Sequence, residues 1–226
     1  MTLSSVLEPG RPPQRVRDDL WLFPPNRDCR GGSSWWLNCD PEPVLIDCPP
    51  LTDATLAALQ DLSAARHPRI LLTSREGHGR IQRLQEHLGW PVLVQEQEAY
   101  LLPGVTPLDA FQKTHITAAG LRLLWTPGPS PGSCVVHAPA PWNVLFCGRL
   151  LIPMTVDTVA PLRHRRTFHW TRQLRSLEEL RGWIPSDQCP ALASGAGLGA
   201  LRGDRLSYWT SWTTADQTLQ QPVMPS

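Results

Sequence analysis

The chain has almost no lysine, since Lys113 is the only one and all its other basic residues are arginines. A GC-rich genome accounts for this skew without any recognition chemistry. A large net charge is also missing: the 226 residues carry a formal charge of +1 at pH 7. No overall electrostatic field therefore draws the protein to nucleic acid or to a membrane surface.

Long hydrophobic runs and cysteine motifs are absent as well. No apolar run approaches the ~18 residues of a membrane span, and residues 1–19 lack the apolar core of a signal peptide. We therefore expect a cytoplasmic protein that does not enter a membrane. The six cysteines include no C-x-x-C pair, which predicts reduced thiols in or near the core rather than a zinc ribbon or a disulfide framework.

Familiar catalytic and cofactor motifs are missing too. The sequence has no G-x-S-x-G nucleophile motif and no internal repeat at a fixed short period. The glycine-rich segment 195–203, GAGLGALRG, lacks the G-x-G-x-x-G register of a dinucleotide loop.

Prolines and tryptophans are abundant, with 24 and 10 residues, so short elements separated by turns should enclose large aromatic side chains. The length fits one domain over residues 19–203, with a loose arm at 1–18 and a polar tail at 204–226.

Periodicity predicts helices around 51–67 with Thr52 as N-cap, 78–90, 96–102 and 176–184, the last with a capping box of Ser176 and Glu179. The predicted strands are 20–23, 33–39, 43–48, 69–73, 91–95, 121–125, 133–138, 143–147 and 191–194. This order favours an α/β (α+β) fold, a four-layer αββα sandwich of two mixed sheets.

Five loop segments carry a resemblance. They are VLID (44–47), ILLT (70–73), TPGPSPGS (126–133), VLFCGRLL (144–151) and SGAGLG (194–199). Their succession over about residues 20–203 resembles the metallo-β-lactamase-fold hydrolases, a superfamily that includes hydroxyacylglutathione hydrolases. The resemblance implies the αββα sandwich and a site for two metal ions, held by histidines and carboxylates of these loops.

The residues at the resembling ligand positions depart from that pattern. Those positions hold Ser74, Glu76, His78, Gly79, Pro129, Arg149 and Ala196. Proline and alanine have no side-chain lone pair, and arginine is a cation at any working pH. The sequence therefore predicts no metal cofactor, with one zinc or iron ion weakly held by Glu76 and His78 as the alternative.

A site that has lost its two metal cations leaves charged side chains that need new partners. We therefore predict an ion pair between Arg149 and Glu76, with Arg75 as a competing partner. The alternative is that Glu76 and Arg75 point to solvent. His78 is expected at the surface unless it is a remaining ligand. Asp47 is expected to close its own turn through an Asx hydrogen bond.

The segment 161–175 is rich in arginine and aromatic residues. Its residues Arg163, Arg165 and Arg166, together with Arg149, are candidates for binding a small anion. A solvated face or a docking surface for a protein partner is the simpler interpretation, and nucleic-acid binding is the less favoured one.

The leading functional prediction is a binding or structural module with no catalytic residues, built on a metallo-β-lactamase fold that has lost its metal ligands. Two alternatives stay open. One is a divergent metal-dependent hydrolase of thioesters or phosphoesters, with Arg149 stabilising an anionic intermediate. The other is a nucleic-acid-associated protein that uses the arginines of 161–175.

Overall fold

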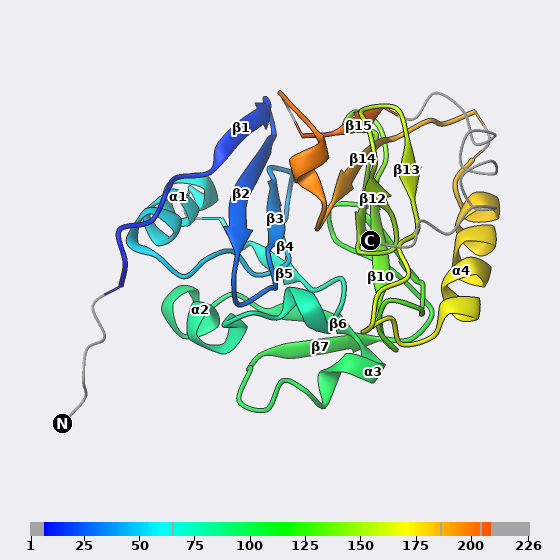
Figure 1. Cartoon of the computed structure of the whole chain (residues 1–226). Helices are drawn as coiled ribbons and strands as arrows, with labels where there is room; N and C mark the ends of the chain where they lie inside the picture. The colour runs from blue at the N-terminus through cyan, green and yellow to red at the C-terminus, as the bar shows by residue number, and fades with distance from the viewer. Residues whose placement is uncertain (1–6, 65, 186, 204, 209–226) are drawn as a thin grey trace.

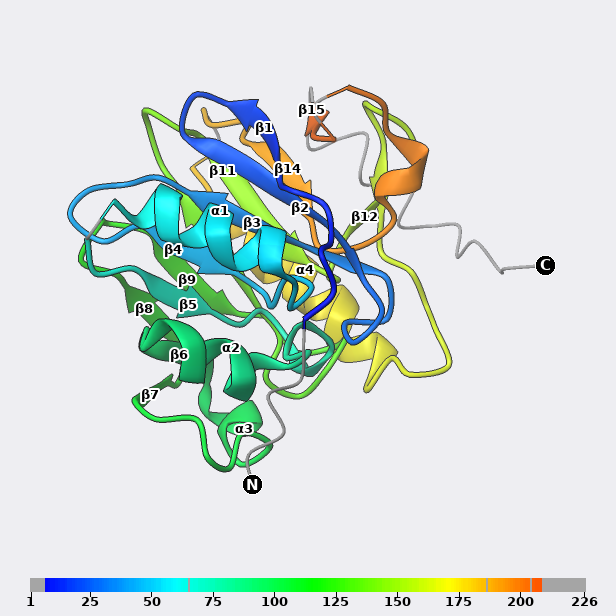
Figure 2. The same ribbon diagram turned by 90° about the vertical axis from the view of Figure 1, so that its left-hand side faces the viewer.

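Two β-sheets pack face to face and carry helices on their outer faces (Figure 1). The computed structural model describes residues 7–64, 66–185, 187–203 and 205–208. Helices α1 (Asp53–Ser63) and α2 (Ile81–Leu88) cover the first sheet, as Figure 2 shows from that side. Helix α4 (Trp170–Trp183) covers the second sheet. The predicted αββα sandwich is confirmed.

The first sheet combines a meander with a parallel half. Its strands, in spatial order, are β1 (Gln14–Arg17), β2 (Leu20–Asn26), β3 (Gly32–Leu37), β4 (Val44–Ile46), β5 (Arg69–Leu71), β6 (Val92–Gln95) and β7 (Leu108–Phe111). The pairs from β1 to β4 are antiparallel, and those from β4 to β7 are parallel. Helices α1 and α2 are the crossovers that parallel neighbours require.

The second sheet is mostly antiparallel. Its order is β15 (Ser207–Tyr208), β14 (Ala191–Ser194), β11 (Val144–Gly148), β10 (Cys134–Ala138), β9 (Arg122–Trp125) and β8 (Thr114–Ile116). Only β11 and β14 pair in parallel, with α4 as their crossover. A small ribbon of β12 (Ile152–Pro153) and β13 (Val159–Ala160) lies beside it.

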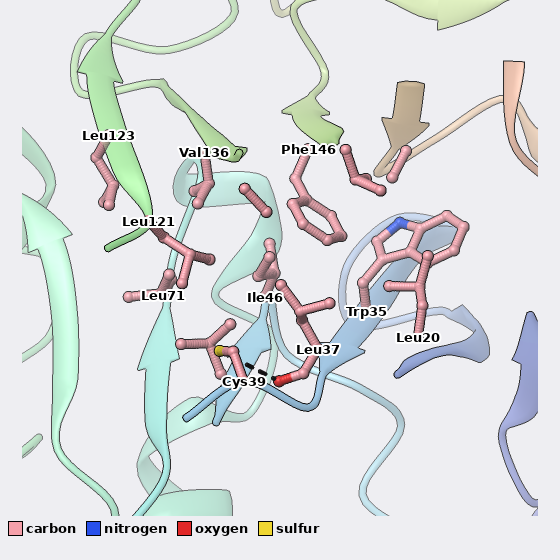
Figure 3. Packing of buried hydrophobic residues seen from close by; sticks show 14 of the residues in the cluster. Leu20, Trp35, Leu37, Cys39, Ile46, Leu71, Leu121, Leu123, Val136 and Phe146 are labelled. Atoms are coloured by element: carbon pink, nitrogen blue, oxygen red, sulfur yellow. Dashed lines mark hydrogen bonds between the residues drawn. The ribbon is translucent and has the colours of Figure 1, made fainter. Parts of the chain in front are cut away.

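Strand alternation sorts the large side chains between the layers. In β3, Trp35 and Leu37 enter the core between the sheets, whereas Trp36 packs toward α1 and α2. Figure 3 shows Trp35 and Leu37 in that inter-sheet core, together with Phe146 from the second sheet. A third cluster joins the second sheet to α4. Since strands such as β4 and β11 are covered on both faces, their sequences, VLI and VLFCG, are continuously apolar rather than alternating.

The predicted helices on the first sheet are confirmed with trimmed ends. Thr52 is the N-cap of α1, and its side chain accepts a hydrogen bond from the Thr55 N–H. The segment at 96–102 contains only the short helix α3 (Glu96–Ala99). Two 3₁₀ turns, η1 (Arg75–Gly77) and η2 (Leu198–Ala200), complete the helical elements in the described residues.

The start of the last helix was predicted incorrectly. Helix α4 begins at Trp170, and the His169 side chain caps it by accepting from the Arg172 N–H at 3.3 Å. Ser176 lies inside the helix and donates to the Pro127 carbonyl at 2.8 Å. The Ser176 hydroxyl therefore binds a distant carbonyl instead of capping the helix. The local sequence pattern around Ser176 gives no sign of this partner.

The ends of the domain also differ from expectation. Residues 14–17, expected in a loose arm, form β1, and Ser207–Tyr208 of the expected tail form β15. The rest of the tail lies outside the described residues, apart from Arg205 and Leu206. All six cysteines are free thiols, and only Cys189 is exposed. None of the helices in the described ranges has the length and apolar character to cross a membrane.

Candidate functional site

A cavity of about 350 Å³ brings together residues that are far apart in the sequence. Four of the residues predicted at the former metal-ligand positions line it: Glu76 from η1, Pro129 from the loop after β9, Arg149 after β11 and Ala196 after β14. The fold thus places the ends of four separate segments around one space. The cavity is lined in addition by Arg30 and Arg166.

An ion pair crosses this cavity, as the sequence predicted. The Arg149 Nε lies 2.9 Å from Glu76 Oε2, and both side chains are about 80% buried, with exposed fractions of 22% and 20%. The Arg149 Nη2 also donates to the Cys29 carbonyl at 2.6 Å. Arg75, the predicted competitor, instead pairs with Glu98, its Nε lying 3.1 Å from Glu98 Oε2. Two acceptors therefore fix the Arg149 guanidinium.

The turn that presents Arg149 depends on a glycine. Gly148 ends β11 with φ of +51°, and a Cβ there would lie 2.6 Å from Thr73 Oγ1. The Gly148 carbonyl accepts from the Gly195 N–H at 2.8 Å. These contacts hold the Arg149 and Ala196 turns side by side at one rim of the cavity.

Asp47 connects the loops after β4 and β5 rather than closing its own turn. Its Oδ1 accepts from the Thr73 N–H at 2.8 Å, and its Oδ2 accepts from the Thr73 hydroxyl at 2.7 Å. Burial raises the pKa of Asp47 to about 6, although the Thr73 hydrogen bonds and the Arg149 charge act to lower it. The expected Asx role is therefore corrected: the partner is 26 residues away in the sequence.

The loop TPGPSPGS at 126–133 is held from both sides. On one side the Gly128 carbonyl accepts from the His169 N–H at 3.0 Å, where α4 begins. On the other side the Gly132 N–H donates to Glu98 Oε1 at 2.9 Å. Within the loop, the Ser133 hydroxyl accepts from the Ser130 N–H at 2.7 Å. The rigid loop thus ties α3 to the start of α4 and places Pro129 in the cavity wall.

The other residues of the first motif do not line this cavity. Ser74 and Asp47 line a small crevice that shares Glu76 and Arg149 with the cavity. His78, expected at the surface, is buried, and burial lowers its pKa to about 4. Its Nε2 has no hydrogen-bond partner among the described residues. His78 and Glu76 are therefore not brought together as lining residues of one cavity.

Gly79 has a packing role. It is in the left-handed region with φ of +49°, and a Cβ there would lie 2.8 Å from Cys29 Sγ and 3.1 Å from Cys48 Sγ. A side chain at this position would displace those buried thiols. Within the described part of the chain, no group of three or more His, Cys, Asp or Glu side chains is placed to hold a metal ion.

The arginine-rich segment contributes one arginine to the cavity. Arg163, Arg165 and Arg166 are all exposed, and of these three only Arg166 lines the cavity. Arg30 was missed by the sequence analysis, although its Nε lies 3.9 Å from Glu76 Oε1. It lies between β2 and β3, more than a hundred residues from Arg149, and no local motif marks it. Its backbone has a positive φ of 54°, which the sequence does not mark by a recognisable pattern.

Comparisons with known proteins identify the fold. No protein-family model matches the chain, and no curated protein matches it. Among solved structures, the chain is similar to the BLEG-1 B3 metallo-β-lactamase, with 23% identity, a TM-score of 0.59, and coverage of 79% of this chain and 91% of that one. It is similar to the DIM-1 metallo-β-lactamase, with 13% identity, a TM-score of 0.64, and coverage of 84% and 90%.

A third solved structure, TTHA1623 in a di-iron-bound form, is 23% identical, with a TM-score of 0.57 and coverage of 74% of this chain and 88% of that one. Sequence identities this low show a shared fold and nothing about function. The two mixed sheets, the outer helices and these likenesses agree, and the chain therefore has the metallo-β-lactamase fold.

Proposed function

We propose that this protein is a binding module without a catalytic metal centre, whose cavity receives a small anionic ligand. One observation carries the proposal. A guanidinium, Arg149, occupies the cavity and bonds to both Glu76 and the Cys29 carbonyl. This cation takes a position where the resembling hydrolases would have a metal-bridging carboxylate.

The residues of the cavity do not fit a pair of metal ions. A metal ion requires deprotonated or neutral donor atoms, but Arg149 is cationic, and Pro129 and Ala196 offer no side-chain donor. The Glu76 carboxylate is paired with a cation, and His78 does not line the cavity. No reaction step through a metal is therefore derived for this chain, and no group of metal-ligating side chains among the described residues supports the hydrolase alternative.

The charge of the cavity favours an anion. Three arginines and one glutamate line it, which leaves an excess of two positive charges. Glu76 offsets Arg149, but Arg30 has only the 3.9 Å contact with Glu76. Arg166 has no carboxylate partner within the described residues. The guanidinium groups of Arg30 and Arg166 are therefore suited to a ligand with carboxylate or phosphate oxygens.

The size of the cavity favours a small molecule. A volume of about 350 Å³ lies near the lower end of the range of about 300–1,000 Å³ for small-molecule sites. A nucleic-acid strand or protein segment would need an extended groove. The exposed Arg163 and Arg165 remain candidates for such a partner only outside this cavity.

Metal stoichiometry and phosphate binding test the proposal together. The protein is purified without a tag from cells supplied with zinc and iron, and its metal content is measured by mass spectrometry. We expect no stoichiometric metal and a thermal midpoint that chelators do not change. Inorganic phosphate at low ionic strength should raise that midpoint in the wild type. One tightly bound metal per chain, or the absence of any oxyanion binding, would contradict the proposal.

A further inference from the structure

The positive groups of the cavity differ in how strongly the protein engages them. Arg149 is fixed by Glu76 and by the Cys29 carbonyl. Arg166 has no hydrogen-bond or ion-pair partner for its guanidinium within the described residues. Arg30 is half exposed, at 50%, and its ion pair with Glu76 is long. The cavity thus contains one fixed guanidinium and two others with donors available for a ligand.

A histidine adds a further donor. The His164 Nδ1 accepts a hydrogen bond from the Arg166 N–H at 3.3 Å, and His164 lines the cavity. In a neutral imidazole whose Nδ1 accepts, the proton is on Nε2. The cavity therefore presents N–H donors from three arginines and a histidine, which matches a head group made only of acceptors, such as an oxyanion.

Much of the remaining wall is apolar. Pro129, Ile152, Leu162 and Ala196 line the cavity, and each is half-buried. They come from four separate segments, so the apolar wall is a product of the fold rather than of one local run. A bare inorganic ion would leave this wall in contact with water and gain nothing from it.

We propose that the ligand is an organic anion with one oxyanion head, a carboxylate or a phosphate monoester, and a short apolar body. The head is held by Arg30, Arg166 and Arg149, and the body lies against Leu162 and Ile152. This inference rests on the proposed function, because it specifies the ligand of the same cavity. It adds selectivity: affinity requires both parts of the ligand.

Three probes separate the contributions of head and body. Isothermal titration calorimetry of the full chain at low salt uses phenyl phosphate, inorganic phosphate and benzyl alcohol. We expect phenyl phosphate to bind at least about tenfold more tightly than inorganic phosphate, because a buried phenyl ring removes apolar surface from water. Benzyl alcohol, which lacks the charge, should not bind measurably. Phenylacetate, compared with phenyl phosphate, shows which oxyanion head the arginines prefer.

Variants place the binding in this cavity. Arg166→Gln should weaken phenyl phosphate and inorganic phosphate binding at least about tenfold, because it removes a charged donor from the head site. The matched control is Arg165→Gln at the neighbouring position, which does not line the cavity and should bind like the wild type. Leu162→Ala, which removes apolar surface without adding a donor, should reduce the preference for phenyl phosphate over inorganic phosphate. Thermal melts of each variant confirm that it folds.

The outcomes distinguish the two proposals. Equal affinities for phenyl phosphate and inorganic phosphate would overturn the apolar-body inference and leave an anion-binding cavity. Binding of neither phosphate nor carboxylate probes to the wild type would overturn both. Equal losses in Arg165→Gln and Arg166→Gln would place the bound anion on the exposed segment and overturn both as well.

Discussion

Two arginine–glutamate pairs lie close to the loop 126–133, and they have the same chemistry in different surroundings. In the first, Arg75 binds Glu98, whose side chain is fully buried and also accepts from the Gly132 N–H. In the second, Arg149 binds Glu76, and both side chains line a cavity. Neither residue of the first pair lines that cavity, whereas both residues of the second do.

This difference teaches that the surroundings of an ion pair decide its role. Glu98 is satisfied on both oxygens by groups of the protein, so the Arg75–Glu98 pair stabilises the junction of α3 with the loop. Glu76 instead faces two arginines across a space that a small molecule can enter. We expect substitutions in the first pair to change stability and substitutions in the second to change binding.

The largest effect should come from Glu98→Ala. This substitution leaves the Arg75 guanidinium and the Gly132 N–H without their acceptor inside the protein. Breaking a buried pair by removing one partner typically costs about 3–5 kcal/mol. Because the Arg75 side chain is 37% exposed and keeps access to water, we expect a loss of about 3 kcal/mol, the lower end of that range, in the free energy of unfolding, measured by denaturant titration. Glu96→Ala on the same helix is the control, because Glu96 is exposed and should change stability by less than about 0.5 kcal/mol. Similar losses in both variants would end the structural assignment of Glu98.

The next largest effect tests the loop that adjoins both pairs. Gly128 has φ of +155°, and a Cβ there would lie 2.4 Å from the Gln173 Cα of helix α4. Gly128→Ala should therefore cost about 3 kcal/mol, from backbone strain and from displacement of the helix start. It should also weaken oxyanion binding, since the segment carrying Arg166 is bonded to this loop.

A second glycine provides the control for that variant. Gly182 lies in helix α4, and a Cβ there would meet nothing within 4 Å. Gly182→Ala should stabilise the protein by about 0.5–1 kcal/mol, because alanine is the better helix former. Unfolding titrations that show no difference between the two alanine variants would contradict the packing argument at Gly128.

A smaller effect concerns the pH dependence of stability at His78, which feels the charges of Arg75 and Glu98. Burial lowers the pKa of His78 from 6.5 to about 4, while the Glu98 charge acts to raise it and the Arg75 charge to lower it. Between these values the unfolded chain binds more protons than the folded one, so this contribution to stability is lost as pH falls from about 6.5 toward 4. Near pH 5 the loss is about 2 kcal/mol.

The His78→Gln variant should remove that acid-side loss. The difference in unfolding free energy between pH 7 and pH 5 should be smaller in the variant than in the wild type by about 2 kcal/mol. Nuclear magnetic resonance titration of the wild type gives an independent measure. A His78 signal that titrates near 6.5 would show that the side chain is not buried as described.

The sequence predicted the strands and helices of this fold better than the contacts between distant side chains. Apolar runs such as 33–39 and 143–147 and the helix cap at Thr52 follow local rules, and the structure confirms them. The Arg149–Glu76 pair was predicted because the resemblance placed both residues in one site and because buried charges need partners. The start of α4 was not predicted, since Pro127 and Gly128 hold it from some 40 residues away.

Arg30 and Asp47 show the same limit within the site. Arg30 reaches Glu76 only because β3 and β4 return the chain to η1. The Asp47 carboxylate binds Thr73 across two parallel strands, whereas the sequence suggested only a local turn. Side chains that meet through strand pairing leave no spacing pattern along the chain, and the sequence alone could not identify these partners.

The smallest expected effect comes from a direct comparison of the Arg149–Glu76 and Arg75–Glu98 pairs by matched substitutions. Glu76→Gln removes the one negative charge that lines the cavity while keeping the size of the side chain. One unit charge at about 8 Å and an effective dielectric constant of about 40 contributes about 1 kcal/mol, so phenyl phosphate should bind about fivefold more tightly. Glu98→Gln, the matched change in the buried pair, should leave the affinity unchanged and lower the stability. Calorimetry that finds weaker binding in Glu76→Gln would mean that Glu76 positions Arg149 for the ligand rather than competing with the ligand for it.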